Sequence, residues 1–194
     1  MTKNNPDIEV EYKFIVEDKG ALVMLLDRKS SIKKDREHQS NVMFDNPLGV
    51  MQVTDGRVRV RTHGQSGNKT LTYKKPLSPE NGAKREIEYE IVFTDTNSQI
   101  EKILRAMEFT PSTSYERYRT EWQIGNIHVT LDEYPYSDFI EIEGVKSEIE
   151  ALAKELGFDI SQGLTKPVDT LFQEWRKKYN LPFKPHMRFN DFDK

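Results

Sequence analysis

Apolar and charged side chains alternate along much of this chain. Residues 8–15 read Ile-Glu-Val-Glu-Tyr-Lys-Phe-Ile, so every second side chain is apolar. A period of two is typical of a β-strand that buries one of its faces. Residues 39–63 are expected to be extended around a turn at 46–49. Strands are predicted over residues 57–62, 69–75, 85–91, 115–123, 127–132 and 139–143.

Other segments show the spacing of an amphipathic helix. Ser147 and Glu150 form a capping-box pattern, and Gly157 is expected to end the helix that follows it. Pro167 suits the first position of another helix. The final residues, 181–194, have no clear period. The helical segments are a short one after Asp18, residues 95–108, the segment from Ser147, and the segment from Pro167.

Composition narrows the class of protein. The length of 194 residues suits one domain, and about eight strands with three or four helices favour an α+β fold. The absence of cysteine excludes a disulfide scaffold, a thiolate metal site and a cysteine nucleophile. No stretch approaches the roughly 18 apolar residues that span a bilayer, and the first residues lack a signal-peptide pattern. A cytoplasmic protein without a membrane partner is expected.

The charged residues are numerous and sorted by sign. They make up 31% of the chain, yet 29 basic and 32 acidic residues give a net charge of only −3, which argues against binding to a nucleic acid duplex. Lys13 lies on the first acidic strand. Acidic side chains stand in phase at Glu9, Glu11, Glu88, Glu90, Asp132, Glu141 and Glu143. Basic side chains stand in phase at Arg57, Arg59, Arg61, Lys74, Arg117 and Arg119.

Two interpretations of this pattern differ in where the charged face points. It is either a solvated sheet face with ion pairs of about 0–1 kcal/mol each, or the interior of a closed barrel. Arg57, Arg59 and Arg61 would lie about 7 Å apart along one strand, and their repulsion favours a facing anion or facing carboxylates. Guanidinium groups suit a polyphosphate, and carboxylates suit Mg²⁺ or Mn²⁺. We therefore predict a closed barrel of about eight strands, with a charged lumen and helices packed outside.

A series of motifs resembles the CYTH superfamily of triphosphate tunnel metalloenzymes. This superfamily includes class IV adenylyl cyclases, thiamine triphosphatases and inorganic or RNA triphosphatases. The chain departs from the family pattern at Tyr136-Ser137, where Leu-Gly is common, and at Lys75, where glycine is common. The matching motifs are Glu9-Val10-Glu11-Tyr12-Lys13, Arg57-Val58-Arg59, Leu71-Thr72-Tyr73-Lys74, Arg85 to Glu90, Arg117 with Arg119, Val129 to Asp132, and Phe139 to Gly144.

The resemblance implies a closed, eight-stranded antiparallel β-barrel, which forms a tunnel. It also implies roles for the charged residues. Asp132 would bind metal or orient water, and Glu88 and Glu90 would bind a second metal or brace the arginines. Lys13, Arg59 and Asp132 are the predicted catalytic residues. The predicted metal ligands are Glu9, Glu11, Glu88, Glu90, Asp132, Glu141 and Glu143. The predicted phosphate-binding residues are Lys13, Arg57, Arg59, Arg61, Lys74, Arg117 and Arg119.

The resemblance also implies an activity. The expected reaction is hydrolysis of a small-molecule triphosphate that depends on Mg²⁺ or Mn²⁺. Adenylyl cyclisation and non-catalytic binding of a polyphosphate or nucleotide are the alternatives. A single tunnel domain is expected over residues 1–178, in a monomer or homodimer. Residues 179–194 are expected to cover a tunnel mouth, join a dimer contact or stay mobile. The four histidines lack metal-ligand spacing, which favours structural or surface roles.

Overall fold

A single sheet of nine strands dominates the computed structural model, which describes residues 8–78, 83–95 and 97–192, and the side chains from residue 10 onward. The strands are β1 (Ile8–Ile15), β2 (Ile32–Asp45), β3 (Arg57–His63), β4 (Lys69–Pro76), β5 (Lys84–Phe93), β6 (Thr110–Ile124), β7 (Ile127–Glu133), β8 (Asp138–Glu143) and β9 (His186–Met187). The α-helices are α1 (Lys19–Lys29), α2 (Val50–Val53), α3 (Gln99–Ala106), α4 (Lys146–Glu155) and α5 (Val168–Lys178).

The first eight strands form a closed antiparallel barrel, which confirms the fold that the resemblance implied. Their order is β2-β3-β4-β5-β1-β8-β7-β6, and an additional pairing of β2 with β6 closes the ring. The short strand β9 adds to β6 in parallel, outside this ring. Closure removes the sheet edges and gives each strand one face toward the lumen and one toward the outside.

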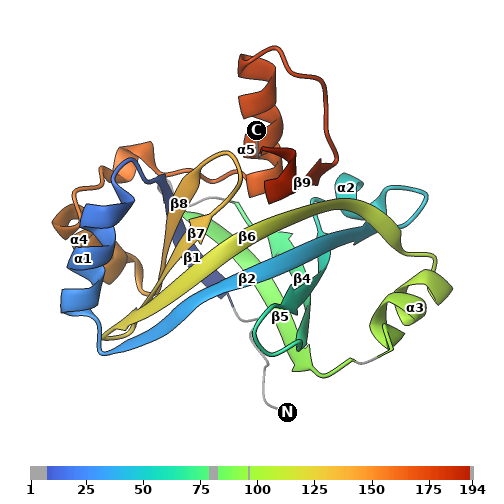
Figure 1. The fold of residues 1–194 in the computed structure, drawn as a ribbon, viewed down its shortest axis with the longest axis horizontal. Helices are drawn as coiled ribbons and strands as arrows, with labels where there is room; N and C mark the ends of the chain where they lie inside the picture. Colours follow the sequence, from blue (N-terminus) through green and yellow to red (C-terminus); the bar gives the residue numbers. More distant parts are fainter. Residues whose placement is uncertain (1–7, 79–82, 96, 193–194) are drawn as a thin grey trace.

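The largest apolar cluster lies on the outside of the barrel. The alternate residues Tyr12 and Phe14 of β1 point outward, and they pack with Leu26 of α1 and Ile149 of α4 in the largest buried cluster. A second cluster joins α3 to β2 and β3, and a third joins α5 to β6 and β8. Figure 1 shows α1 and α4 at one side, α3 at the other, and α5 above the barrel. None of the described helices combines the length and apolarity needed to span a membrane.

Several element boundaries differ from the predictions. β2 begins at Ile32, earlier than the predicted extended segment, and β6 begins at Thr110. The first five residues of β2 are exposed on both faces, so their side chains carry no alternating pattern. They are held by pairing with β6 instead of by burial, and Figure 1 shows the two long strands side by side.

The predicted helix ends meet different outcomes. The capping box at Ser147 is wrong, because the residue that precedes α4 is Val145, and its side chain makes no capping hydrogen bond. Gly157 does follow the end of α4, and its φ of 87° is a left-handed value that glycine adopts without steric cost. Pro167 lies one residue before α5.

Candidate active site

A cavity of about 530 Å³ fills the interior of the barrel. This volume lies within the range of about 300–1,000 Å³ that is usual for small-molecule sites. Asp132 is fully buried and is not among the lining residues, and the side chain of Glu9 lies outside the described part of the chain. The predicted residues that line the cavity are Glu11, Lys13, Arg57, Arg59, Arg61, Lys74, Glu88, Glu90, Arg117, Arg119, Glu141 and Glu143.

The strand register brings three carboxylates onto one wall. Glu11 of β1 lies opposite Glu143 of β8, and Lys13 lies opposite Glu141. Residues 11 and 13 share one face of β1, as residues 141 and 143 share one face of β8. We call Glu11, Glu141 and Glu143 the acidic wall.

Lysine side chains neutralise this acidic wall. The Nζ atom of Lys13 lies 3.0 Å from a Glu141 oxygen and 4.0 Å from a Glu11 oxygen, and the Nζ atom of Lys84 lies 2.6 Å from Glu11. Burial opposes the charge of Lys13, but the carboxylates of Glu141 and Glu11 raise its pKa. Burial likewise opposes the charge of Glu141, whose pKa is held well below its usual range by Lys13 and Arg119. Both side chains therefore stay charged inside the barrel.

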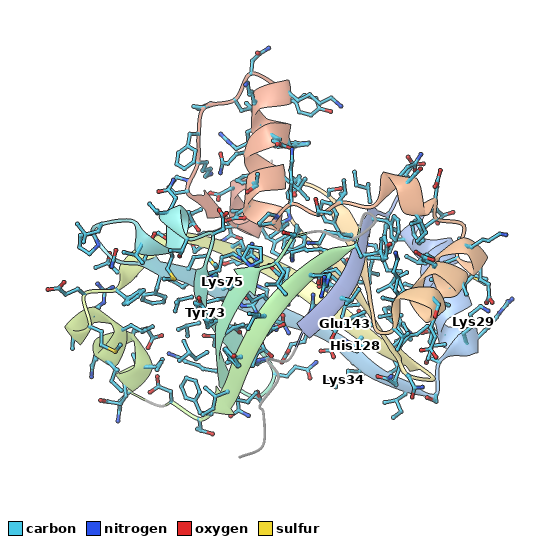
Figure 2. The ribbon with its side chains drawn as sticks, turned by 180° about the vertical axis from the view of Figure 1, so that it is seen from behind. Lys29, Lys34, Tyr73, Lys75, His128 and Glu143 are labelled. Carbon is cyan, nitrogen blue, oxygen red and sulfur yellow. The ribbon has the colours of Figure 1, made fainter. Side chains whose placement is uncertain are left out.

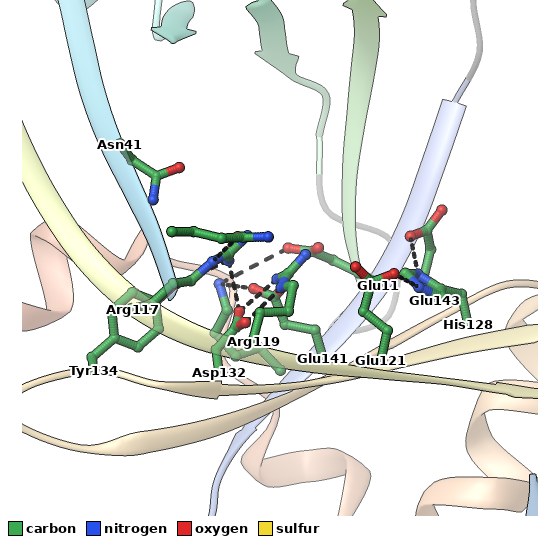
Figure 3. A network of polar contacts seen from close by, with 12 residues as sticks. Glu11, Asn41, Arg117, Arg119, Glu121, His128, Asp132, Tyr134, Glu141 and Glu143 are labelled. Atoms are coloured by element: carbon green, nitrogen blue, oxygen red, sulfur yellow. Dashed lines mark hydrogen bonds and ion pairs between the residues drawn. The ribbon is translucent and has the colours of Figure 1, made fainter. Parts of the chain in front are cut away.

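Four arginines form the opposite part of the lumen, and two of them share one carboxylate. Arg117 donates to Asp132 at 2.8 Å, and Arg119 donates to both oxygens of Asp132 at 2.6 and 2.5 Å (Figure 3). Arg119 also lies 2.7 Å from Glu141. Asp132 thus fixes the orientation of two guanidinium groups, while its predicted role as a metal ligand stays a prediction. We call Arg59, Arg61, Arg117 and Arg119 the arginine cluster.

Arg61 has a neutral partner instead of a carboxylate. Its Nε donates to the amide oxygen of Asn41 at 3.1 Å, and it has no carboxylate partner within the described residues. Its pKa is lowered well below the usual value, first by burial and then by the charges of Arg59, Arg117 and Arg119. Buried donor atoms of Arg59, Arg117 and Asn41 also lack an acceptor. Donors left without acceptors beside a buried cation are the features of an anion site.

Two functional candidates on β5 were missed in the sequence. The Glu86 side chain is 1% exposed and forms ion pairs with Arg57, with Lys84 at 2.7 Å and with Lys74 at 3.8 Å. Lys84 lines the cavity. Both residues share the phase of Glu88, which was the available signal, but Lys84 precedes the predicted strand.

Two tyrosines complete the arginine end of the cavity. The Tyr115 hydroxyl accepts a hydrogen bond from Arg59 at 3.5 Å, and the Tyr134 hydroxyl accepts one from Arg117 at 3.3 Å. Burial raises the pKa of Tyr115, but the nearby arginines outweigh burial and lower it overall. Sequence reasoning missed both tyrosines, although Tyr115 shares the phase of Arg117 and Arg119 on β6. Tyr134 gave no such signal, because it lies beyond the predicted strand 127–132.

One mouth of the cavity carries a cluster of charged side chains. His128 Nε2 lies 3.0 Å from Glu121, and its Nδ1 lies 3.6 Å from Glu143. Lys34 lies 3.0 Å from Glu121. Figure 2 shows Lys34, His128 and Glu143 gathered on this side of the barrel. The carboxylates of Glu121 and Glu143, as acceptors beside the imidazole, raise the pKa of His128 to about 9.

Helix α5 begins at the lining of the cavity. Pro167, Val168 and Asp169 are lining residues, and Phe172 is buried with Tyr134 in the third apolar cluster. The described residues after α5, 179–192, pack on α5 and on β6. Gln173 of α5 donates to the carbonyl of Lys184 at 2.7 Å, and β9 pairs with β6. The division of the chain at residue 178 stays a prediction.

The acidic wall has the donor chemistry that a hard divalent cation requires. Mg²⁺ and Mn²⁺ prefer carboxylate oxygens, and Glu11, Glu141 and Glu143 present them on two paired strands. Among the residues that the structure describes, no three acidic or histidine side chains converge as a ready-made metal cluster. The donors therefore fit a cation in kind, but each is engaged by lysine, arginine or histidine.

The comparison with protein families agrees with this geometry. The model of the CYTH domain matches residues 7–168. The chain belongs to the CYTH domain family. This match covers all eight barrel strands and confirms the resemblance seen in the sequence. None of the curated proteins compared with the chain matches it.

Solved structures share the CYTH barrel. A proposed adenylate cyclase from Vibrio parahaemolyticus superposes with a TM-score of 0.74 at 16% identity, over 87% of this chain and 99% of that one. A protein from Pyrococcus horikoshii OT3 superposes with a TM-score of 0.69 at 22% sequence identity. The match covers 87% of this chain and 99% of that one. A proposed adenylyl cyclase from Hippeastrum is described as having a dominant triphosphatase activity. It superposes with a TM-score of 0.62 at 18% sequence identity, over 90% of this chain and 97% of that one. At these identities the likeness establishes the fold.

Proposed function

We propose that this CYTH protein is a divalent-metal-dependent phosphohydrolase that acts on a triphosphate bound in the tunnel. The observation that carries the proposal is the arginine cluster, in which Arg61 is 8% exposed and has no carboxylate partner among the described residues. A buried cation without a counter-ion is costly, and a phosphate chain supplies both the charge and the acceptors. The Hippeastrum protein, with its dominant triphosphatase activity, supports the same reaction class.

The residues of the tunnel divide the work of binding. Arg59, Arg61, Arg117 and Arg119 would bind and neutralise the phosphate oxygens, with Arg57 and Lys74 extending the binding surface along β3 and β4. Asp132 would hold Arg117 and Arg119 in position. Preorganised donors of this kind stabilise charge that develops on the transferred phosphoryl group.

The acidic wall would hold the metal. Glu11, Glu141 and Glu143 supply carboxylate oxygens, and the predicted contribution of Glu9 rests on the Glu-x-Glu motif. When bound, Mg²⁺ or Mn²⁺ supplies positive charge that neutralises phosphate oxygens. Lys13, between Glu11 and Glu141, would contact the same phosphates from the acidic side.

Hydrolysis transfers the terminal phosphoryl group to water. The water oxygen forms a bond to the terminal phosphorus, and the bond between that phosphorus and the bridging oxygen breaks. The remaining diphosphate leaves and keeps the bridging oxygen. The proton released by the water passes to a lumen carboxylate or to solvent. The arginine cluster neutralises the charge on the oxygens throughout this step.

Adenylyl cyclisation is the second candidate, favoured by the descriptions of the Vibrio and Hippeastrum neighbours. In that reaction the ribose 3′-hydroxyl attacks the α-phosphorus and pyrophosphate leaves. The same arrangement of cations would bind the triphosphate of ATP, so product analysis is needed to separate the two reactions.

The test is incubation with tripolyphosphate, thiamine triphosphate or ATP, each with Mg²⁺ or Mn²⁺. Orthophosphate release supports the hydrolase, cyclic AMP with pyrophosphate supports the cyclase, and binding without turnover supports a binding module. Arg59→Ala is expected to lower kcat/KM by about 10²–10³, the usual effect of removing a donor that faces transition-state charge. Glu155→Gln, on an exposed ion pair of α4, serves as the control.

A further inference from the structure

Lys84 occupies the junction between two networks of buried charge. Its ammonium lies 2.6 Å from Glu11 of the acidic wall and 2.7 Å from Glu86. Its side chain is 11% exposed and lines the cavity. Burial lowers the pKa of Lys84, and the charge of Glu11 opposes this effect. The positive charges of Lys13, Lys74 and Arg57 add to it, so that the pKa is lowered overall. Lys84 is therefore a crowded cation beside the phosphate-binding residues.

The two carboxylates that Lys84 bridges depend on it to different degrees. Glu86 also contacts Arg57, and it lies 3.8 Å from Lys74, so it stays neutralised without Lys84. Among the residues that the structure describes, Glu11 would retain Lys13 alone, at 4.0 Å. Departure of Lys84 therefore frees the carboxylate of Glu11 and leaves that of Glu86 paired.

We propose that Lys84 is an exchangeable counter-ion of Glu11. A divalent cation displaces the Lys84 ammonium from Glu11, and the released ammonium then binds the polyanion. This proposal rests on the proposed function for the identity of the ligands. The flexible four-carbon stem of lysine allows such a movement. Exchange couples the two ligands: a cation that takes Glu11 releases an ammonium for the anion, and the coupling is reciprocal. Lys84 thus couples the binding of the metal to the binding of the anion.

Binding measurements test the exchange without any turnover. Mn²⁺ is titrated calorimetrically into the wild type and into Lys84→Met, with and without excess sulfate as a weakly chelating anion. Removal of the ammonium is expected to raise the affinity for Mn²⁺ alone by at least about tenfold, equivalent to 1.4 kcal/mol. Sulfate should strengthen Mn²⁺ binding in the wild type and have a smaller effect in the variant.

Lys69→Met is the matched control. Lys69 also bridges two carboxylates, Glu101 at 2.6 Å and Asp95 at 3.6 Å, but it is not among the residues that line the cavity. It should leave Mn²⁺ affinity unchanged, and Lys84→Arg should retain the weak affinity of the wild type. Lys84→Gln replaces the Met variant where thermal melting shows that the latter is unfolded.

The outcomes separate this proposal from the proposed function. Equal or weaker Mn²⁺ affinity in Lys84→Met overturns the exchange alone, as does a gain shared by Lys69→Met. If Lys84→Met loses sulfate binding but keeps its Mn²⁺ affinity unchanged, Lys84 is a simple anion ligand, and the exchange is again overturned. Failure of all the proteins to bind Mn²⁺ overturns the exchange together with the proposed metal dependence.

Discussion

Two arginines of β6 and Arg61 of β3 are buried in the same lumen but differ in their partners. The β6 arginines have a carboxylate partner, and Arg61 has a neutral one among the described residues. Arg117 and Arg119 on β6 share the carboxylate of Asp132, which is fully buried behind them. Arg61 on β3 hydrogen-bonds to the neutral amide of Asn41 and faces other cations. In the first arrangement the protein itself supplies the counter-ion. In the second an external anion would have to supply it.

This difference separates arginines that a protein carboxylate holds in position from an arginine that has no carboxylate among the described residues. A carboxylate that holds two guanidinium groups fixes their direction before the ligand arrives, so little reorganisation is needed during the reaction. A buried cation without a carboxylate destabilises the fold and contributes its attraction to ligand binding instead. Substitutions on the two sides should therefore have opposite effects on stability.

The largest effect is expected from Asp132→Asn. Loss of its charge leaves Arg117 and Arg119 buried without their shared partner. Breaking a buried ion pair from one side costs about 3–5 kcal/mol, so the free energy of unfolding measured in urea should fall by that amount. Glu155→Gln, in an exposed ion pair with Lys29, should change it by less than about 1 kcal/mol. Equal effects of the two substitutions would contradict the bracing role.

Arg61→Met should show the opposite sign. Replacing a buried, unpaired cation by an apolar side chain is expected to raise the free energy of unfolding by about 1 kcal/mol or more. Affinity for sulfate or tripolyphosphate should fall by about tenfold or more, because a hydrogen bond to a charged group contributes about 1.5–3 kcal/mol. Thermal melting with and without the anion measures both effects. A variant that is less stable but binds the anion normally would place Arg61 with the bracing residues.

The mouth of the tunnel offers a pH-dependent test of a completed pair. His128 has a pKa near 9 beside Glu121, above its usual value of 6.5. A raised pKa stabilises the fold fully below about pH 6.5, and this contribution is lost as the pH rises through about 9. Because the side chain is 35% exposed, the loss should be about 1–2 kcal/mol after screening. Urea denaturation from pH 6 to pH 10 measures this loss.

The matched variants for the mouth are His128→Gln and Glu121→Gln. Each should flatten the pH dependence of stability over this interval, because each removes one member of the pair. If the wild type and both variants lose stability in parallel, another group is responsible for the titration.

The smallest effect is expected from Lys34→Gln. Lys34 pairs with the same Glu121, but its side chain is 72% exposed. Exposed ion pairs contribute about 0–1 kcal/mol and are screened by salt. The change in the free energy of unfolding should stay below about 1 kcal/mol and vanish in high salt. A larger, salt-insensitive change would mean that Lys34 belongs with the buried network.

Much of the fold could be predicted from the alternation of side chains. Tyr12 and Phe14 point outward and Glu11 and Lys13 point inward, as the period of two requires. The start of β2 could not be predicted, because its first residues are exposed on both faces and pair only with distant β6. The beginning of α4 was misplaced because the Ser147 capping pattern is local, whereas the strand β8 that precedes the helix sets where it starts.

The site could be predicted in composition but not in pairing. The charged residues that line the cavity share the phases seen in the sequence, and Lys84 and Glu86 continue the phase of Glu88. Their partners come from strands far apart in the chain. Arg117, for example, meets Gln39 of β2 at 2.9 Å as well as Asp132 of β7. Such contacts depend on barrel closure and register, which no local pattern contains.

The sequence by itself determined which faces of the strands are charged, with which sign, and that the apolar packing lies on the other face. This follows from the period of two, which assigns every residue of a strand to one face. Only the tertiary structure decided which charges neutralise one another. Closure gave Asp132 to two arginines, Lys84 to two glutamates, and no carboxylate among the described residues to Arg61. Electrostatic energy depends on distance, and distances across the lumen exist only after the barrel has closed.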